Sequence, residues 1–360
     1  MSMRAFPRDL LVDVLTRRQA IDTLNVDQWN WLLPRARTAR LLPRLAAIGE
    51  DAGCLLRLPS GVESQLAAGA ILGESHRRSM LWEIGRVRRA LAPLGIPIIL
   101  LKGAAYLAAD LPPARGRLAS DVDIMVSKES LAAVEAALLA AGWQSEKPDP
   151  YDQRYYRMWM HELPPLRHRV RRTVLDVHHT ILPPISRLRP DPEKLWQAAR
   201  PVSLPFLMLA PADMVLHATA HLFQDSDLDT RLRDLLDIHD LLLWFGRDSS
   251  FWPTLTSRAE VLDLGRPLFY ALRYSQRLMG TPVPAGIEGD LDTVAPPALV
   301  RGLMDWLVPR VLIPSGSVWS VRERSHATKL LYIRSHWLRM PPLLLGSHLA
   351  RRVVFRAKAG

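Results

Sequence analysis

Residues 120–126 constrain the fold and chemistry of this chain more than any other segment. The run is apolar enough for a β-strand, but Asp121 and Asp123 interrupt it at alternate positions. Side chains two residues apart on a strand point to the same face, so these carboxylates project side by side. Two carboxylates this close repel each other unless a cation lies between them. The segment therefore predicts a strand that carries a site for a hard cation such as Mg²⁺.

A second strand-like run, residues 174–178, supplies a third carboxylate, Asp176. Two strands that together carry three acids can hold two metal ions for phosphoryl or nucleotidyl transfer. His178 shares a face with Asp176, where it can assist proton transfer, support a metal ligand or simply pack beside the site. His179 points to the opposite face, and we expect a structural role for it.

The bulk composition is that of a folded globular protein, because 48% of the 360 residues are hydrophobic and 23% are charged. This length allows two or three domains. Cys54 is the single cysteine, so no disulfide can form within one chain, as suits the cytosol. The sequence shows no signal peptide and no apolar run of the roughly 18 residues that a membrane span needs. We therefore expect a cytoplasmic protein.

Apolar periodicity divides the chain into helical and mixed parts. Apolar residues recur at helical spacing up to about residue 93 and again from about residue 211, whereas strand-like runs occur only between about 94 and 182. The predicted fold class is therefore α+β, with a small mixed sheet flanked by helices. The expected domains are an N-terminal helical region, a sheet-containing core and a C-terminal helical domain, at residues 1–93, 94–185 and 206–360.

Three segments of the sequence give further structural predictions. Residues 151–160 are aromatic and basic, and we expect a strand or a mobile flap there. Ser127 is a good N-cap for a helix over residues 131–141. Prolines are dense from residue 183 to 205, which indicates a linker wrapped around a short helix near Trp196.

The order of the motifs resembles a known family. The chain carries Leu-Lys-Gly at residues 101–103, then Arg117, then the Asp-x-Asp strand and finally Asp-Val-His at residues 176–178. This order is similar to that of the polymerase-beta-like nucleotidyltransferase superfamily. More narrowly, it resembles a bacterial family of uncharacterised nucleotidyltransferases. The motifs span roughly residues 80–180, and a looser likeness extends to about residue 245.

The resemblance implies an activity and a set of site residues. Asp121, Asp123 and Asp176 would bind two Mg²⁺ ions, one orienting an NTP and the other helping to activate an acceptor hydroxyl. A nucleoside monophosphate would be transferred, and pyrophosphate would leave. The acceptor could be a small molecule, a protein or an RNA.

Nucleotide binding is expected at Lys102, Gly103 and Arg117. The superfamily usually has Gly-Ser at the turn after the first strand, but this chain has Gly103-Ala104 and a longer spacing to Asp121. Lys102 can supply the missing anion contact as a point charge, or it can be a surface lysine. Gly103 can let a phosphate approach the amides of the next helix. Arg117 either reaches the same phosphates or neutralises the acid cluster.

A later predicted helix carries Asp213, His217 and His221 at four-residue spacing, hence on one face. Two histidines at this spacing can bind zinc, but the glutamate of the His-Glu-x-x-His signature is absent. The family resemblance instead places His221 at the border of the active cleft, together with Arg231, Asp234 and Asp237. The alternative is a polar network that holds two helices together.

The C-terminal part of the chain is strongly basic. From residue 301 onward there are eleven Lys or Arg residues and two acidic residues, Asp305 and Glu323, which gives a surplus of nine positive charges. Such a segment favours polyanions, so a nucleic-acid or membrane-surface binder stays open as an alternative, as does an inactive binding or regulatory protein that keeps the fold. For residues 341–360 we favour a terminal helix packed on the domain over one that lies on anionic lipid, because Pro341, Pro342 and Gly346 interrupt the apolar stretch.

Overall fold

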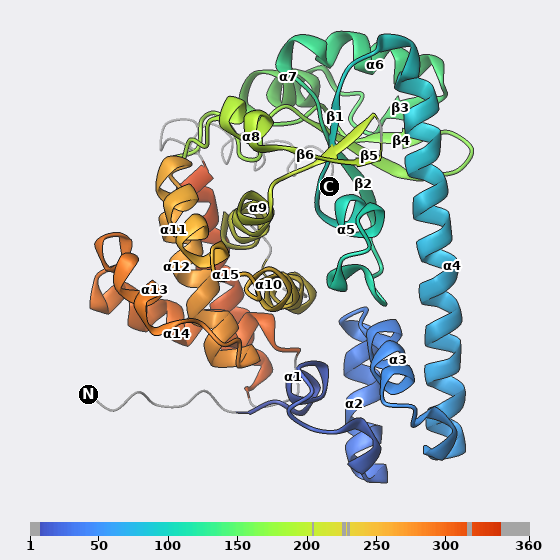
Figure 1. Cartoon of the computed structure of the whole chain (residues 1–360), viewed down its shortest axis with the longest axis vertical. Helices are drawn as coiled ribbons and strands as arrows, with labels where there is room; N and C mark the ends of the chain where they lie inside the picture. Colours follow the sequence, from blue (N-terminus) through green and yellow to red (C-terminus); the bar gives the residue numbers. More distant parts are fainter. Residues whose placement is uncertain (1–7, 204, 225–227, 229–230, 315–318, 340–360) are drawn as a thin grey trace, which may run out of the picture.

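The computed structural model describes residues 8–203, 205–224, 228, 231–314 and 319–339. A mixed seven-stranded sheet with the strand order β3-β4-β5-β2-β1-β7-β6 lies among helices (Figure 1). The strands are β1 Ile98–Leu100, β2 Asp121–Met125, β3 Trp143–Ser145, β4 Leu166–His168, β5 Val174–His178, β6 Arg200–Ser203 and β7 Phe206–Met208. This architecture confirms the predicted α+β class; the domain boundaries stay a prediction.

β1, the neighbour of the central strand β2, is short, apolar and wholly buried. It pairs with β2 in antiparallel orientation and with β7 in parallel orientation. On its other side, β2 runs parallel to β5, and this register sets Asp123 opposite Asp176. The two acid-bearing runs that periodicity predicted are thus neighbouring strands of one sheet.

Two strands lie outside the range in which the sequence predicted them. β6 forms within the proline-rich stretch and β7 directly after it, so the expectation that strands occur only up to about residue 182 is wrong. The prolines argued against strands at this point of the sequence, because proline cannot donate a backbone hydrogen bond to a neighbouring strand. Pro201 is tolerated because β6 is the edge strand of the sheet. The short helix expected near Trp196 is present as α8, Pro192–Ala198.

Four helices precede the sheet: α1 Leu10–Leu15, α2 Val26–Thr38, α3 Leu42–Asp51 and α4 Ser60–Leu91. Asn25 starts α2 through a capping box, in which its side chain and that of Gln28 each accept a backbone N–H at 2.9 Å. α4 runs from α3 along one side of the molecule up to the sheet (Figure 1). Its buried residues near the sheet are those that helical periodicity predicted: Met80, Ile84, Val87 and Leu91.

The loop after α5, Lys102–Ala108, joins these N-terminal helices to the rest of the fold. It contains the 3₁₀ turn η4, Pro112–Ala114, and Gly116, which has φ +68°. A Cβ at Gly116 would lie 2.7 Å from the Cα of Arg44 in α3, so only glycine permits this contact. The Arg44 guanidinium also donates to Asp240 in α10, Leu232–Phe245, at 2.6 Å.

Residues 151–160 form neither the strand nor the flap that the sequence suggested. They lie in α7, Pro150–Trp159. The Asp149 carboxylate accepts the backbone N–H groups of Tyr151 and Asp152 at 2.8 and 3.3 Å, and Pro150 occupies the first helical position. Both features are strong helix-start signals, and they outweigh the aromatic content of the segment.

The helix after β2 begins at residue 131 as predicted, but its N-cap differs from the expectation. Ser127 caps the 3₁₀ turn η5, Lys128–Ser130, and α6 begins only after it, at Leu131–Ala140. The Ser127 hydroxyl lies 3.0 Å from the Ser130 hydroxyl and makes no side-chain capping bond. The predicted helix is therefore present, but Ser127 is not its N-cap.

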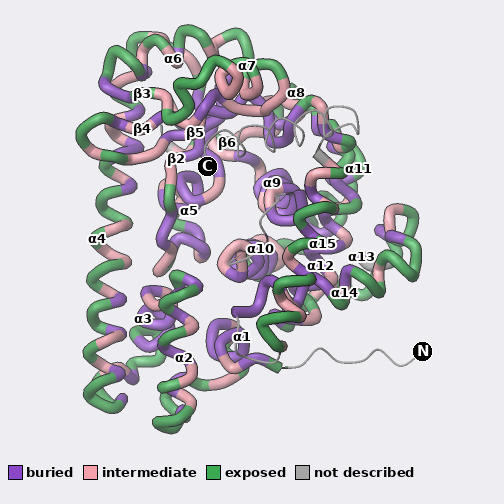
Figure 2. Tube along the Cα trace, turned by 180° about the vertical axis from the view of Figure 1, so that it is seen from behind, coloured by how far each residue is buried: buried purple, intermediate pink, exposed green. Residues whose placement is uncertain are grey.

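The C-terminal helices enclose the lower side of the sheet (Figure 1). α9 Pro211–Gln224 and α10 pack against each other and are largely buried (Figure 2). The others are α11 Phe251–Val261, α12 Gly265–Tyr274, α13 Ala285–Asp290, α14 Ala298–Leu312 and α15 Val321–Arg339. Among the described residues, no helix is long and apolar enough to cross a membrane. The expectation for residues 341–360 falls outside the described part of the chain.

Candidate active site

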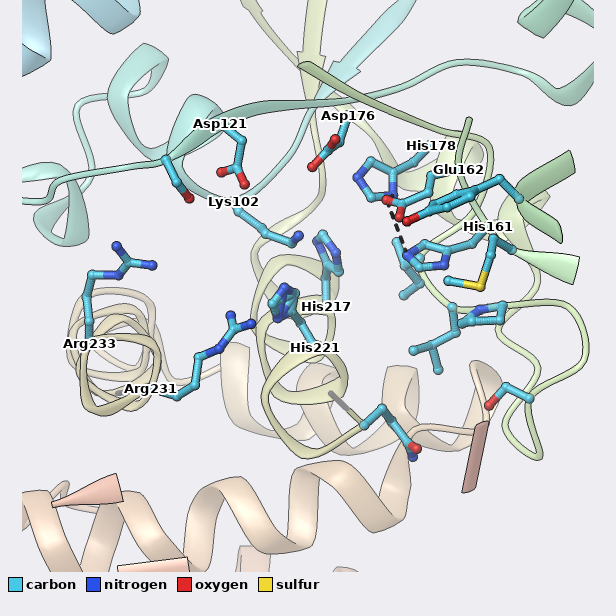
Figure 3. A pocket seen from close by; sticks show the side chains of 18 of the residues that line it. Lys102, Asp121, His161, Glu162, Asp176, His178, His217, His221, Arg231 and Arg233 are labelled. Atoms are coloured by element: carbon cyan, nitrogen blue, oxygen red, sulfur yellow. Dashed lines mark ion pairs between the residues drawn. The ribbon is translucent and has the colours of Figure 1, made fainter. Parts of the chain in front are cut away.

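The three predicted carboxylates lie on one face of two adjacent strands. Asp121 and Asp123 are two residues apart on β2, and Asp176 on β5 is the register partner of Asp123. Asp123 is buried, whereas Asp121 and Asp176 are half-buried and point into a cavity of about 510 Å³ (Figure 3). The sheet therefore brings the three acids together at a space large enough for a substrate.

The cavity gathers side chains from distant parts of the chain. Its floor is formed by the strand acids and His178, and its opposite side by α9 and the start of α10 (Figure 3). Arg40, after α2, reaches it from the N-terminal helices. The polar side chains that line it are Thr38, Arg40, Lys102, Ser120, Asp121, Tyr156, His161, Glu162, Asp176, His178, Ser186, His217, His221, Gln224, Arg231 and Arg233.

Asp123 is held in its charged form by two neighbours. Lys102 Nζ donates to Asp123 Oδ1 at 3.0 Å, and His178 Nε2 lies 3.2 Å from the same oxygen. Burial alone would raise the pKa of Asp123, but Lys102 and His178 outweigh it and hold that pKa well below its usual value. Asp123 is thus a fixed negative charge at the back of the site.

Lys102 occupies a strained position at the junction of β1 and α5. Its φ is +43°, a left-handed conformation that non-glycine residues rarely adopt. This backbone conformation is not that of a residue at the tip of a loop. It occurs where the Lys102 side chain makes a contact, because the ammonium group is directed at Asp123. Burial disfavours this ammonium, but Asp123 and then Asp121 outweigh burial and raise its pKa. Lys102 is therefore a half-buried cation beside the acids, not the solvated surface lysine of the alternative interpretation.

The other two carboxylates lack such compensation. Burial, followed by repulsion from Asp123, raises the pKa of Asp121. Burial, followed by repulsion from Glu162 and Asp123, raises the pKa of Asp176 well above its usual value. Among the described residues, the buried Asp176 Oδ1 has no hydrogen-bond partner. An all-oxygen donor set with a buried unpaired oxygen fits Mg²⁺, which prefers carboxylate ligands and relieves their repulsion.

Gly103 and Arg117 meet each other in the structure. A Cβ at Gly103 would clash with the Arg117 guanidinium and would lie 3.2 Å from the Cβ of Ala119. Arg117 Nε donates to Asp237 Oδ2 in α10 at 2.8 Å, and both side chains are nearly buried. Arg117 and Asp237 line a small cavity of about 60 Å³ next to the main one. The group that approaches Gly103 is therefore Arg117, and the nucleotide contacts of both residues stay predictions.

The residues of α9 and α10 divide between the cavity and the core. Asp213 is fully buried and pairs with Arg258 at 2.7 Å, away from the site. His217 and His221 line the cavity beside Lys102 (Figure 3). Burial, and then Lys102, lowers the pKa of both imidazoles well below the usual value. Both rings are therefore neutral at physiological pH.

The basic residues at the start of α10 are anchored by an acid. Arg231 and Arg233 lie 2.9 and 3.3 Å from the Asp234 carboxylate, and Arg233 also donates to the Leu118 carbonyl at 2.6 Å. Both guanidinium groups line the main cavity, whereas Asp234 and Asp237 line the smaller one. Burial raises the pKa of Asp237, and the Arg117 cation opposes this rise.

Sequence reasoning missed many of the lining residues, among them Arg40, Tyr156, His161, Glu162 and Arg233. Two of them had a usable signal, because His161 and Glu162 are adjacent and lie shortly before the strand that carries Asp176. Arg40 had none, since it precedes the Leu-Lys-Gly motif at residues 101–103 by about sixty residues. Its position depends on the packing of α3 against the loop after α5.

A comparison with protein families assigns the chain to a family. The profile of the family described as uncharacterised nucleotidyltransferases matches residues 25–280, which is most of the chain. The fold and the match define a nucleotidyltransferase, an enzyme that transfers phosphorus-containing groups. The chain belongs to the uncharacterised nucleotidyltransferase family, which confirms the resemblance seen in the motifs. Comparisons with curated proteins and with solved structures give no significant match.

Proposed function

We propose that this enzyme transfers a nucleoside monophosphate from an NTP to an acceptor hydroxyl, with Mg²⁺ held by Asp121, Asp123 and Asp176. The observation that carries the proposal is the β2–β5 register, which places Asp123 opposite Asp176 on the face that lines the cavity. The buried, unpaired Oδ1 of Asp176 supports a cation at this point. When bound, Mg²⁺ supplies charge neutralisation of the triphosphate and polarisation of the α-phosphate.

The positively charged side chains of the cavity support the binding of a triphosphate there. Arg231 and Arg233 lie across the cavity from the carboxylates, and Lys102 lies beside the carboxylates (Figure 3). Arg40 adds a fourth cation, which is exposed and has no hydrogen-bond or ion-pair partner among the described residues. A polyphosphate is bound best where several donors converge, and Arg offers a planar fork to phosphate oxygens. We assign the β- and γ-phosphates to this cationic side of the cavity.

The acceptor side is assigned to the less polar wall. Tyr156, Met160, Ile181, Leu182 and Pro183 also line the cavity. In the reaction, the acceptor oxygen forms a bond to the α-phosphorus, and the bond from that phosphorus to pyrophosphate breaks. Because Asp176 Oδ1 is assigned to the cation, we assign the proton of the acceptor hydroxyl to the other oxygen of the Asp176 carboxylate. The wall favours an acceptor that carries an apolar portion beside its hydroxyl.

The test is a labelled-nucleotide assay on the full chain. Purified protein with Mg²⁺ and each α-labelled NTP is incubated with a pool of small molecules, RNA and protein. Label transfer and pyrophosphate release are then measured. We expect transfer with wild type and none with Asp121→Asn or Asp123→Asn. If the protein binds NTP but releases no pyrophosphate with any acceptor, the result would contradict catalysis and support the inactive, regulatory alternative.

A further inference from the structure

A second cluster of metal-binding side chains lies beside the acid trio. Suitable ligand atoms of His161, Glu162 and His178 all lie within 4.8 Å of one another. His178 Nδ1 is 3.4 Å from Glu162 Oε2, and His161 Nε2 is 3.9 Å from the same oxygen. Figure 3 shows the three side chains turned toward one another at one end of the cavity. The backbone helps to hold them, because Glu162 and His178 form an isolated antiparallel β-bridge.

The donor set differs in kind from that of the three aspartates. Two imidazole nitrogens and one carboxylate oxygen suit a transition-metal ion of the Zn²⁺ class, whereas Mg²⁺ prefers oxygen alone. Two histidines and one glutamate are also a set that leaves a coordination position open for water or substrate. The cluster lines the 510 Å³ cavity, so an open position would face the substrate space.

His178 is oriented as a metal-binding histidine requires. Its Nε2 lies 3.2 Å from Asp123 Oδ1, while its Nδ1 faces Glu162. A proton on Nε2, donated to Asp123, leaves the lone pair of Nδ1 free for a metal. Metal-binding histidines usually donate their second ring N–H to a carboxylate in this way, which fixes the tautomer and raises ligand basicity. His178 is 1% exposed, so the ring has little freedom to leave this orientation.

We propose that His161, Glu162 and His178 bind one divalent transition-metal ion of the Zn²⁺ class, at a site separate from the Mg²⁺ carboxylates. The binding site itself stands on its own geometry. Its role rests on the proposed function: the open position would hold the acceptor oxygen on the side of the cavity next to Asp176. Asp123 then links the two centres, because it serves the carboxylate trio and orients His178.

The experiment titrates metal into the full chain after removal of bound metal with a chelator. Co²⁺ serves as a spectroscopic probe for nitrogen ligation, and Zn²⁺ binding is measured by calorimetry with Mg²⁺ in excess. We expect one Zn²⁺ per chain, and at least a 10-fold loss of affinity in His161→Ala and in Glu162→Gln. His326→Ala, which removes an exposed histidine on α15, is the matched control and should bind Zn²⁺ as wild type does.

The outcomes separate this inference from the proposed function. Asp121→Asn should keep the Zn²⁺ site while losing transfer. Zn²⁺ binding that is weak, or equally strong in His161→Ala, Glu162→Gln and wild type, would overturn the site even if transfer is observed. A Zn²⁺ site that responds to both variants in a protein without transfer would support the site and count against the proposed function. Circular dichroism of each variant checks that a loss of binding is not a loss of fold.

Discussion

Asp123 on β2 lies directly opposite Asp176 on the parallel neighbour β5, although the two residues are 53 positions apart in the chain. Only one of them is compensated by the protein: Lys102 and His178 hold Asp123, whereas Asp176 keeps a buried oxygen without a hydrogen bond among the described residues. We infer from this asymmetry that the carboxylates repel each other in the protein without metal and that the proposed cation would bind on the Asp176 side.

Replacement of one aspartate should therefore have opposite effects on activity and stability. Asp121→Asn is expected to reduce transfer by about 100- to 1000-fold or more, the cost of losing one group that stabilises developing charge. Without metal, the same change removes a repelled carboxylate and should raise the melting temperature. Asp27→Asn, an exposed acid of α2, is the control and should change neither. Equal turnover of Asp121→Asn and wild type would remove the carboxylate trio from the mechanism.

Gly103 is expected to act through Arg117. Gly103→Ala should cost about 1–3 kcal/mol of unfolding free energy, because its new methyl group meets the Arg117 guanidinium in a packed interior. In an Arg117→Ala background the methyl group has space, so most of this cost should disappear. Urea unfolding of the two single variants and the double variant measures the coupling. The alternative role of Gly103 is to let a phosphate approach the backbone. It would be supported if the two losses of unfolding free energy are additive and if Gly103→Ala alone raises the KM for NTP.

Arg40 should bind the nucleotide although it lies outside the motif region. Arg40→Ala is expected to raise the KM for NTP by about 10-fold, in keeping with the loss of one charge-assisted hydrogen bond. Stability should be unchanged, since the side chain is exposed and makes no hydrogen bond or ion pair with other described residues. Arg37→Ala is the charge-matched control, because Arg37 is exposed on α2 and donates to Gln65 at 2.7 Å. A similar rise in KM for both variants would indicate long-range charge rather than contact.

The sequence predicted the parts of the site that depend on local periodicity. Alternation placed Asp121 and Asp123 on one face, and the same argument put Asp176 and His178 on another strand. It could not find the partner of Arg117, because Asp237 is 120 residues away and is brought near only by the packing of α10. Glu162 was missed for a similar reason: an isolated bridge to His178, outside any regular strand, sets its position.

Buried His239 in α10 should make stability depend on pH. Its Nδ1 lies 2.7 Å from the Thr281 hydroxyl, and burial, followed by Arg44 and Arg18, lowers its pKa to about 4. The unfolded chain has the ordinary histidine pKa of about 6.5 and so binds a proton first as the pH falls. The stability from neutral His239 is therefore present above about pH 6.5 and is lost as the pH falls toward 4.

The expected loss between pH 7 and pH 5 is about 2 kcal/mol of unfolding free energy. His239→Asn keeps a polar group toward Thr281 but does not titrate, so its unfolding free energy should fall less over this range by that amount. Asp240, whose pKa is raised to about 6 mainly by burial, titrates in the same range and contributes with opposite sign. It is present in both proteins, so it cancels in the difference as long as its own pKa is unaffected. Urea unfolding of wild type and His239→Asn at both pH values measures this difference, and parallel curves would show that His239 is not held neutral by the fold.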